Sequence, residues 1–280
     1  MNEILRISGW MLAAACVASG CAARAQQSVY ARFRGDNASM AAVQPSWMGP
    51  VIQSDARLGQ AARFSVSNSA CSGAHTIDYG NGHGTGVIVD RRFQIDFDPP
   101  SFFRNHSATL KDGFGNAATQ VKWRIASGNA GHGNFIVSAI LYHGFAPRAY
   151  QNGNLSSIWK PTLAAGRGFS HFAVITDLGG ALPTTRISEQ GRTITWDTTA
   201  QVHPNSHVWF DVENNATFSV GGPFSGTTQN FVTPAAYYQV RRKDWKPEHA
   251  TVVFDCGLQV ATTRFHWYNH NLVTEMRIFF

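Results

Sequence analysis

The chain has 280 residues, only 14% of them charged, and its formal net charge is +6. Soluble globular domains usually contain about 25% charged residues, so this composition disfavours an ordinary soluble enzyme. The basic residues form no run and no patch interleaved with aromatic residues, which disfavours a nucleic-acid-binding protein. The length fits one large β domain or two small ones.

Residues 1–25 have the pattern of an export signal. Arg6 supplies a positive charge, "GWMLAAACVASG" is a short apolar run, and Ala23-Arg24-Ala25 is a small-x-small cleavage site. The pattern predicts Sec-type export with cleavage after Ala25. This removes Arg6, Arg24 and Glu3, so the net charge falls from +6 to +5. The alternative is a lipoprotein acylated at Cys21 of "ASGC", although the usual leucine three residues earlier is absent.

Residues 26–56 form a separate lead before the first predicted strand. Its stretch "MAAVQPSWMGPVIQSD" has no strand alternation. This predicts either a disordered periplasmic lead or a plug that folds into the lumen of a barrel. Export permits a disulfide between Cys71 and Cys256, but their spacing does not establish one.

From residue 57 to residue 280 the dominant pattern is alternation of apolar and polar side chains. In "TQVKWRI" (residues 119–125), for example, Gln120, Lys122 and Arg124 alternate with apolar residues and a threonine. Side chains alternate between the two faces of a strand, so each such segment has one apolar and one polar face. The pattern predicts twelve strands, over residues 57–67, 84–89, 93–98, 115–126, 134–145, 156–165, 169–181, 191–203, 207–217, 228–241, 250–262 and 271–280.

The predicted connections differ in length by parity. The odd ones are mostly long and rich in Gly and Asn, such as "NSACSGAHTIDYGNGHG" and "PPSFFRNHSATLKDG", whereas the even ones, such as "VDRR" and "HPNS", are mostly shorter. Outer-membrane barrels have short periplasmic turns and longer outer loops. The predicted fold is therefore all-β: an antiparallel, transmembrane, up-and-down β-barrel of about 12 strands, over residues 57–280.

The charged faces of the predicted strands should line the lumen, because an arginine turned toward lipid at the midplane would cost about 2–4 kcal/mol. Asp96 and Asp98 would lie beside Lys122 and Arg124, and Glu275 and Arg277 would face Arg63 across the seam. The candidate transport-path residues are Arg63, Asp96, Asp98, Lys122, Arg124, Asp197, Asp211, Glu213, Glu275 and Arg277.

The final segment "LVTEMRIFF" predicts a last strand that closes against the first. A terminal aromatic residue preceded by alternating apolar residues is what outer-membrane assembly machinery reads. The predicted insertion signal consists of Leu272, Met276, Ile278 and Phe280.

Four segments carry a resemblance to a known family: "KDGFGNAATQVKWRIASGNAGHGN", "PTLAAGRGF", "GRTITWDTTAQV" and "GLQVATTRFHWYNHNLVTEMRIFF". From about residue 57 to its end, the chain resembles a transporter-like family of bacterial outer-membrane β-barrels. That family is related to barrel proteins found with meta-pathway phenol-degradation genes. The resemblance implies an outer-membrane barrel without catalytic residues, and solutes of an aromatic kind. Cys256 and the charged turn "RRKDWKPEH" depart from the expected pattern.

The remaining motifs predict neither a cofactor nor a metal site. "NGHGTG" lacks the strand-to-helix setting and the Lys-Ser/Thr ending of a phosphate loop. "FHWYNHN" reads as interface aromatics with polar loop residues, since its two histidines lack a third metal ligand. For a lipid hydrolase, the candidates His143, His171, Ser138 and Ser170 follow no motif that places nucleophile, base and orienting amide together.

The predicted function is an outer-membrane channel or transporter for small, neutral, aromatic or apolar solutes. Its expected partners are outer-membrane lipid, the barrel-assembly machinery and the solute, with no nucleic acid. Two alternatives remain open at this point: a barrel enzyme that acts on membrane lipid, and a soluble periplasmic β-sandwich that binds a ligand.

The export signal predicts where the mature chain begins and where it is found. Fractionation of a Gram-negative host should place the protein in the outer membrane, and mass spectrometry should give Gln26 as its first residue. Recovery from the periplasm without detergent would contradict this prediction.

Overall fold

The computed structural model describes residues 29–71, 74–80, 82–107, 110–146, 152–240 and 250–280. Within these residues, three short helical elements accompany the strands: α2 (Val29–Ala41), the 3-10 helix η1 (Ala130–His132) and α3 (Ile187–Gln190). The strands are β1 (Ala61–Cys71), β2 (Ala74–Tyr79), β3 (Gly84–Asp90), β4 (Phe93–Asp98), β5 (Phe102–His106), β6 (Gly113–Phe114), β7 (Ala118–Gly128), β8 (Phe135–Gly144), β9 (Ile158–Phe169), β10 (Phe172–Pro183), β11 (Thr193–Val202), β12 (Val208–Ser219), β13 (Thr228–Val240), β14 (Thr251–Ala261) and β15 (His270–Phe279).

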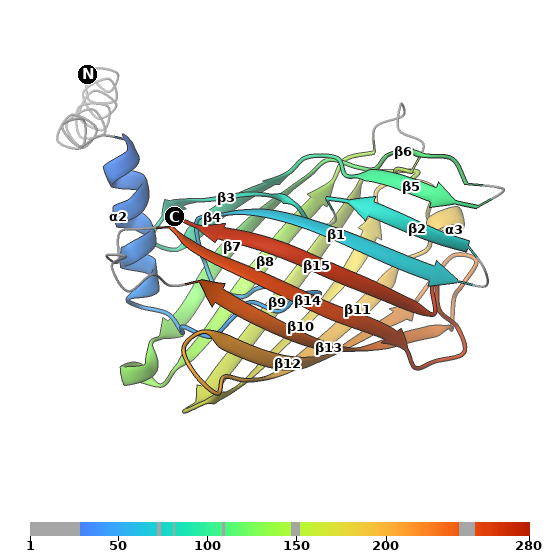
Figure 1. The fold of residues 1–280 in the computed structure, drawn as a ribbon. Helices are drawn as coiled ribbons and strands as arrows, with labels where there is room; N and C mark the ends of the chain where they lie inside the picture. Colours follow the sequence, from blue (N-terminus) through green and yellow to red (C-terminus); the bar gives the residue numbers. More distant parts are fainter. Residues whose placement is uncertain (1–28, 72–73, 81, 108–109, 147–151, 241–249) are drawn as a thin grey trace, which may run out of the picture.

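The strands form one antiparallel sheet that closes on itself (Figure 1). The closing seam pairs Ala61–Ala70 of β1 with His270–Phe279 of β15. A closed ring leaves no strand edge unpaired. The predicted seam between the first and last strands is therefore present, and the closed ring excludes the β-sandwich alternative.

Three strands of the wall are divided in two. β1 pairs with β3 over Ala61–Arg63 and with β2 over Val66–Cys71, so β2 and β3 are two halves of one wall strand. The same holds for β4 with β5 and for β6 with β7. Two of the three breaks fall at Gly80, which has φ +105°, and at Pro99-Pro100, which cannot donate backbone hydrogen bonds. The third, between β6 and β7, spans residues 115–117. With each divided strand counted once, the barrel has 12 strands, as predicted.

Two of the predicted long outer loops are wrong in their lengths. "NSACSGAHTIDYGNGHG" contains β2, and "PPSFFRNHSATLKDG" contains β5 and the first residue of β6. The breaks interrupt the alternation of apolar and polar residues in these stretches. For this reason β2 and β5 lack a clear strand pattern in the sequence. The first strand begins at Ala61 rather than at residue 57, because the backbone of Leu58 and Gly59 bonds to side chains instead of a neighbouring strand.

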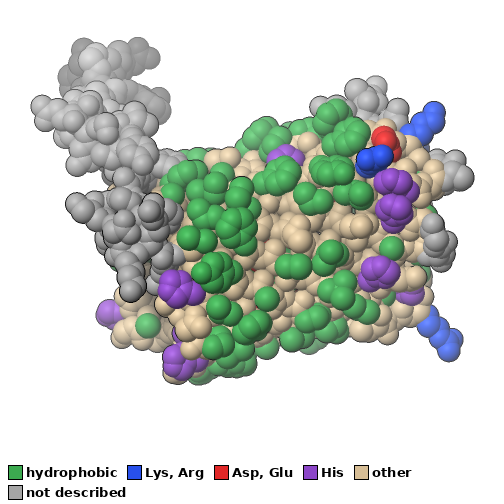
Figure 2. Space-filling model, viewed as in Figure 1, with side chains coloured by type: hydrophobic (Ala, Val, Ile, Leu, Met, Phe, Trp, Pro, Cys, Tyr) green, Lys and Arg blue, Asp and Glu red, His purple; other side chains and the backbone are tan. Residues whose placement is uncertain are grey.

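The outer face of the barrel is apolar. Leu163, Leu178 and Trp196 are each more than half exposed, and Figure 2 shows hydrophobic side chains spread over the visible face between its two ends. Exposed aromatic residues gather near both ends of the wall. One girdle lies at the end that holds the chain's last residue, and contains Phe93, Trp123, Phe169, Phe172, Phe210 and Tyr238. The other contains Phe114, Phe145, Trp159, Phe224 and Trp267.

Helix α2 lies outside the barrel, near the end at which β15 finishes (Figure 1). Met40 near its end packs with Leu58 and Ile88, and all three are buried. Among the residues that the structure describes, no helix is long and apolar enough to cross a membrane.

The apolar outer face generates a prediction for a native cysteine. Cys256 of β14 is exposed and forms no disulfide. In liposomes, lipid should shield Cys256 from a bulky aqueous thiol reagent, whereas a membrane-permeant reagent should label it. A Cys71→Ser variant reports Cys256 alone. Rapid labelling by the aqueous reagent before unfolding would show that this face meets water.

Candidate functional site: the lumen and its N-terminal segment

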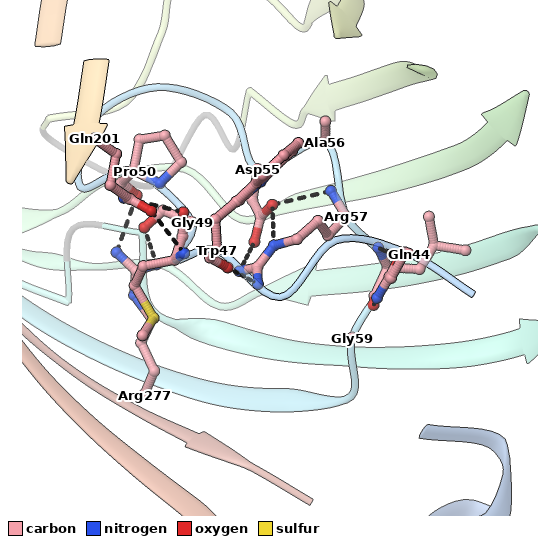
Figure 3. A network of polar contacts seen from close by, with 12 residues as sticks. Gln44, Trp47, Gly49, Pro50, Asp55, Ala56, Arg57, Gly59, Gln201 and Arg277 are labelled. Carbon is pink, nitrogen blue, oxygen red and sulfur yellow. Dashed lines mark hydrogen bonds and ion pairs between the residues drawn. The ribbon is translucent and has the colours of Figure 1, made fainter. Parts of the chain in front are cut away.

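Residues 44–60, named here the lumen segment, run from α2 into the barrel interior before β1 begins (Figures 1 and 3). The segment has no regular secondary structure, so its backbone groups need partners from the wall. Its buried residues are Gln44, Pro45, Trp47, Met48, Gly49, Pro50, Gln53, Ala56, Leu58 and Gln60. The segment therefore occupies the lumen as a packed element.

Carboxylates of the wall bind N–H groups of the lumen segment. Glu213 on β12 accepts hydrogen bonds from three consecutive backbone nitrogens, those of Val51 (2.6 Å), Ile52 (3.1 Å) and Gln53 (2.9 Å). Asp177 on β10 accepts one from the nitrogen of Ser54 at 3.2 Å. Bonds to charged acceptors are stronger than bonds between neutral groups, so these two carboxylates are major anchors of the segment.

Arg277 on β15 binds the carbonyl groups of the same segment. Its two terminal nitrogens donate to the carbonyls of Gly49 (2.7 Å) and Pro50 (2.9 Å). Its Nε atom lies 2.6 Å from Glu275 and 3.1 Å from Asp255. These carboxylates compensate the buried guanidinium, which is only 3% exposed.

Neutral side chains of the wall complete the attachment. Gln201 accepts a hydrogen bond from the nitrogen of Met48 at 2.8 Å and donates one to its carbonyl at 3.2 Å. Ser138 donates to the carbonyl of Ala56 at 2.6 Å. With Asp177, Glu213 and Arg277, these contacts come from five strands around the ring.

An ion pair inside the segment fixes its turn. Arg57 donates two bonds from its guanidinium to the carboxylate of Asp55, at 3.1 and 2.9 Å, and another to the carbonyl of Trp47 (Figure 3). Burial alone would raise the pKa of Asp55, but the adjacent Arg57 outweighs it and holds this pKa far below its usual value of 3.8. The pair therefore stays ionised at physiological pH.

The inner wall around the segment is partly apolar. Trp47, Met48 and Ala56 pack in one buried cluster with inward-facing side chains of the wall. The wall residues of this cluster are Ile136, Ile140, Ala164, Ala173, Ile175, Trp209, Ala235, Tyr237 and Val253. Removal of apolar area from water stabilises the segment at roughly 25 cal/mol per Å².

Polar contacts also tie the segment to the chain's last residue. Asn37 of α2 accepts a hydrogen bond from the nitrogen of Gln60 and donates one to the carbonyl of Phe280. The nitrogen of Phe280 donates to the carbonyl of Gln60 at 3.1 Å. Between α2, the segment and the wall lies a cavity of about 690 Å³, bordered by Arg63, Lys122 and Arg277 among others.

The structure turns the predicted transport-path residues inward, toward the lumen segment and the polar groups around it. Seven of them are at most 9% exposed: Asp96, Lys122, Arg124, Asp211, Glu213, Glu275 and Arg277. Arg63, Asp98 and Asp197 are half-buried. Lys122 pairs with Asp96 at 3.7 Å, on neighbouring strands as predicted, whereas Arg124 donates to the carbonyl of Arg91.

Of the predicted insertion signal, Leu272 and Met276 are exposed on the outer face, and Ile278 and Phe280 are half-buried. Their role in insertion stays a prediction.

Of the two residues predicted to face Arg63 across the seam, Arg277 lies directly opposite it in the register, whereas Glu275 lies opposite Ser65. Arg277 takes Glu275 and Asp255 as its ionic partners. Sequence reasoning missed Asp255, and also Asp177, because inward neighbours such as Val253 and Ile175 are apolar. These apolar neighbours pack against the lumen segment. In β10 and β14, therefore, both faces of the strand carry apolar residues, and the alternation of polar and apolar residues is lost.

The residues weighed for hydrolysis are not brought together. The hydroxyl of Ser138 faces the lumen segment, while His143 stacks on Trp159 with ring centroids 4.1 Å apart. His171 contacts another histidine, His203. In the part of the chain that the structure describes, no three metal-ligating side chains form a metal-binding group.

The first five residues of the stretch "FHWYNHN" form an outer loop, and its last two begin β15. The ring of His266 bonds to Thr263 and Asn269, at 2.7 and 2.8 Å. Trp267 packs against Phe224 of the neighbouring loop, with centroids 4.8 Å apart. Burial raises the pKa of Tyr268 to about 12, and its hydroxyl donates to Gln259. These contacts explain the motif by packing and hydrogen bonding.

No protein-family profile and no curated protein sequence matches this chain. Several solved structures, however, match it in fold. The NanC porin has a TM-score of 0.50 and 8% identity, over 79% of this chain and 98% of that one. The COG4313 outer membrane channel from Pseudomonas putida F1 has a TM-score of 0.50 and 12% identity, over 84% of this chain and all of that one. At such identities the likeness establishes the barrel fold alone.

The carboxylate of Glu213 generates a prediction about the segment. Glu213→Gln removes bonds to a charged acceptor, each worth roughly 1.5–3 kcal/mol. Hydrogen exchange of the amides of residues 51–53 should then be faster by at least about tenfold. Barrel amides should keep their protection, as should all amides in the matched control Asp90→Asn at an exposed turn. Unchanged exchange at residues 51–53 would show that Glu213 does not hold the segment.

Proposed function

We propose that the protein is an outer-membrane channel for small solutes whose lumen segment closes the pore. The observation that carries this proposal is a closed barrel whose lumen is filled by a segment held mainly through side-chain contacts. Such contacts can break while the ring of strands stays intact, because no bond within the ring depends on them. Opening then requires displacement of about seventeen residues of irregular chain, not rearrangement of the barrel.

The outer face supports location in a membrane. A closed ring satisfies its backbone groups internally, which a hydrocarbon environment requires. An apolar band between two aromatic girdles is the pattern of membrane-embedded barrels. Outer-membrane lipid would contact this band, and the barrel-assembly machinery would insert it. The export signal predicted over residues 1–25 fits this location.

The lining of the lumen bears on the solute. The family resemblance implies aromatic or apolar solutes. On the side of the segment away from the chain's last residue, the lining is polar, with Ser67, Thr233, Asn215, Gln259 and Asn271 facing inward and buried. Buried polar groups that lack a hydrogen-bond partner in the protein need water or a ligand as partner. The lining therefore supports a solute that carries at least one polar group, with any aromatic part as a second feature.

A disulfide lock tests the proposal. Ser138 Oγ lies 2.6 Å from the carbonyl oxygen of Ala56, so cysteines at these two positions are adjacent. In a background with Cys71→Ala and Cys256→Ala, the pair Ala56→Cys and Ser138→Cys should cross-link the segment to the wall. In planar bilayers the oxidised protein should conduct poorly, and reduction should raise its conductance severalfold.

The single variant Ala56→Cys in the same background is the control and should not respond to the reductant. Equal conductance before and after reduction would show that the segment is not the gate. Absence of conductance in the wild type and in the reduced protein would contradict a channel function altogether.

A further inference from the structure

Charge is divided unevenly around the lumen. The inward-facing charged side chains of β10–β15 are six acids and one base: Asp177, Asp197, Asp211, Glu213, Asp255, Glu275 and Arg277. The other inward-facing bases of the wall, Arg63, Lys122, Arg124 and Lys160, lie on β1–β9. The strands β10–β15 are named here the acidic wall. Its excess of negative charge contrasts with the net charge of +6 of the whole chain.

Two pairs of acids in the acidic wall are direct neighbours across strands. Asp255 lies opposite Glu275, and Arg277 stands between them as their counter-ion. Asp177 lies opposite Asp197, and among the described residues neither forms an ion pair with a base. Like charges directly opposite each other destabilise a sheet. The Asp177–Asp197 pair therefore lacks the positive partner that the second pair has.

The lumen segment shows what kind of group this wall accepts. Three successive N–H groups bind Glu213, and a fourth binds Asp177. All four donors are backbone nitrogens, and they belong to the consecutive residues 51–54. A primary ammonium group likewise presents three N–H donors, and it adds the positive charge that the backbone lacks.

Unpartnered oxygens point to room for such a group. Oδ1 of Asp211 and Oδ1 of Asp255 have no hydrogen-bond partner within the described residues, although these side chains are only 4% and 5% exposed. Buried carboxylate oxygens without a partner are unfavourable. The acidic wall thus retains acceptor capacity beyond what the lumen segment uses.

We propose that the acidic wall binds the ammonium group of small organic amines, which compete with the lumen segment for Glu213 and Asp177. The pore is accordingly selective for cations, and its solutes are amines. This proposal rests on the proposed channel function and names its substrate class. Binding of the amine involves only displacement of N–H donors by N–H donors, so no covalent step is required.

Reversal potentials in planar bilayers test the selectivity. Under a KCl gradient, the full-length protein should pass K⁺ in preference to Cl⁻. Asp177→Asn combined with Glu213→Gln should lower this preference severalfold, and Asp90→Asn, outside the lumen, should not change it. Since Glu213 also anchors the segment, Asp197→Asn is the second variant. Asp197 bonds to Asn215 and to the backbone of Ala216 on β12, and among the described residues no hydrogen bond joins its carboxylate to the segment, so this variant should lower the preference too.

Added n-butylammonium tests the solute class. It should reduce the K⁺ current in a concentration-dependent way, less so in the double variant, whereas n-butanol and butyrate should not. Heat-modifiable gel mobility checks that each variant is folded. A conducting pore that prefers Cl⁻, or whose K⁺ current is indifferent to n-butylammonium, would overturn the amine proposal and leave the channel function standing. A protein that conducts in no state would overturn both.

Discussion

The pairing of β1 with β15 is the constraint on which the rest of this structure depends. It turns a sheet with two open edges into a ring, so that every wall strand has two neighbours. A ring has an inside and an outside, and strand alternation then divides the side chains between them. The apolar set, including Leu163, Leu178 and Trp196, lies outside, and the charged set lies inside. Surface, lumen and site all follow from this division.

The interior of a ring of 12 strands must also be filled. It is wider than the interior of an eight-stranded barrel, which its own side chains fill. The lumen segment meets it with Trp47 and Met48, which fill space against Ile136, Ile175 and Tyr237. Its irregular backbone then needs partners, and Glu213, Arg277 and Gln201 supply them. Burial of the charges of Glu213 and Arg277 is costly by itself, but hydrogen bonds to backbone groups of the segment compensate it.

The sequence predicted the barrel because alternation over β7, β11, β12 and β15 is uninterrupted, and because the last strand ends on outward-facing apolar residues. It also predicted the inward direction of Glu213 and Arg277. It could not predict β2 and β5, which follow the interruptions at Gly80 and at Pro99-Pro100. Nor could it identify Asp177 and Asp255. An inner wall that packs against an extra segment becomes apolar in places, and a period-2 pattern requires the two faces to differ.

The most direct test of the central claim is limited trypsin digestion of the wild-type protein in membranes, read by mass spectrometry. Arg57 lies in the lumen segment, with its guanidinium bound to Asp55 and to the carbonyl of Trp47. If the segment occupies the lumen, the bond after Arg57 should resist cleavage while the barrel is folded and be cut after heat unfolding. Cleavage after Arg57 at similar rates in the folded and unfolded protein would show that the segment does not reside in the barrel.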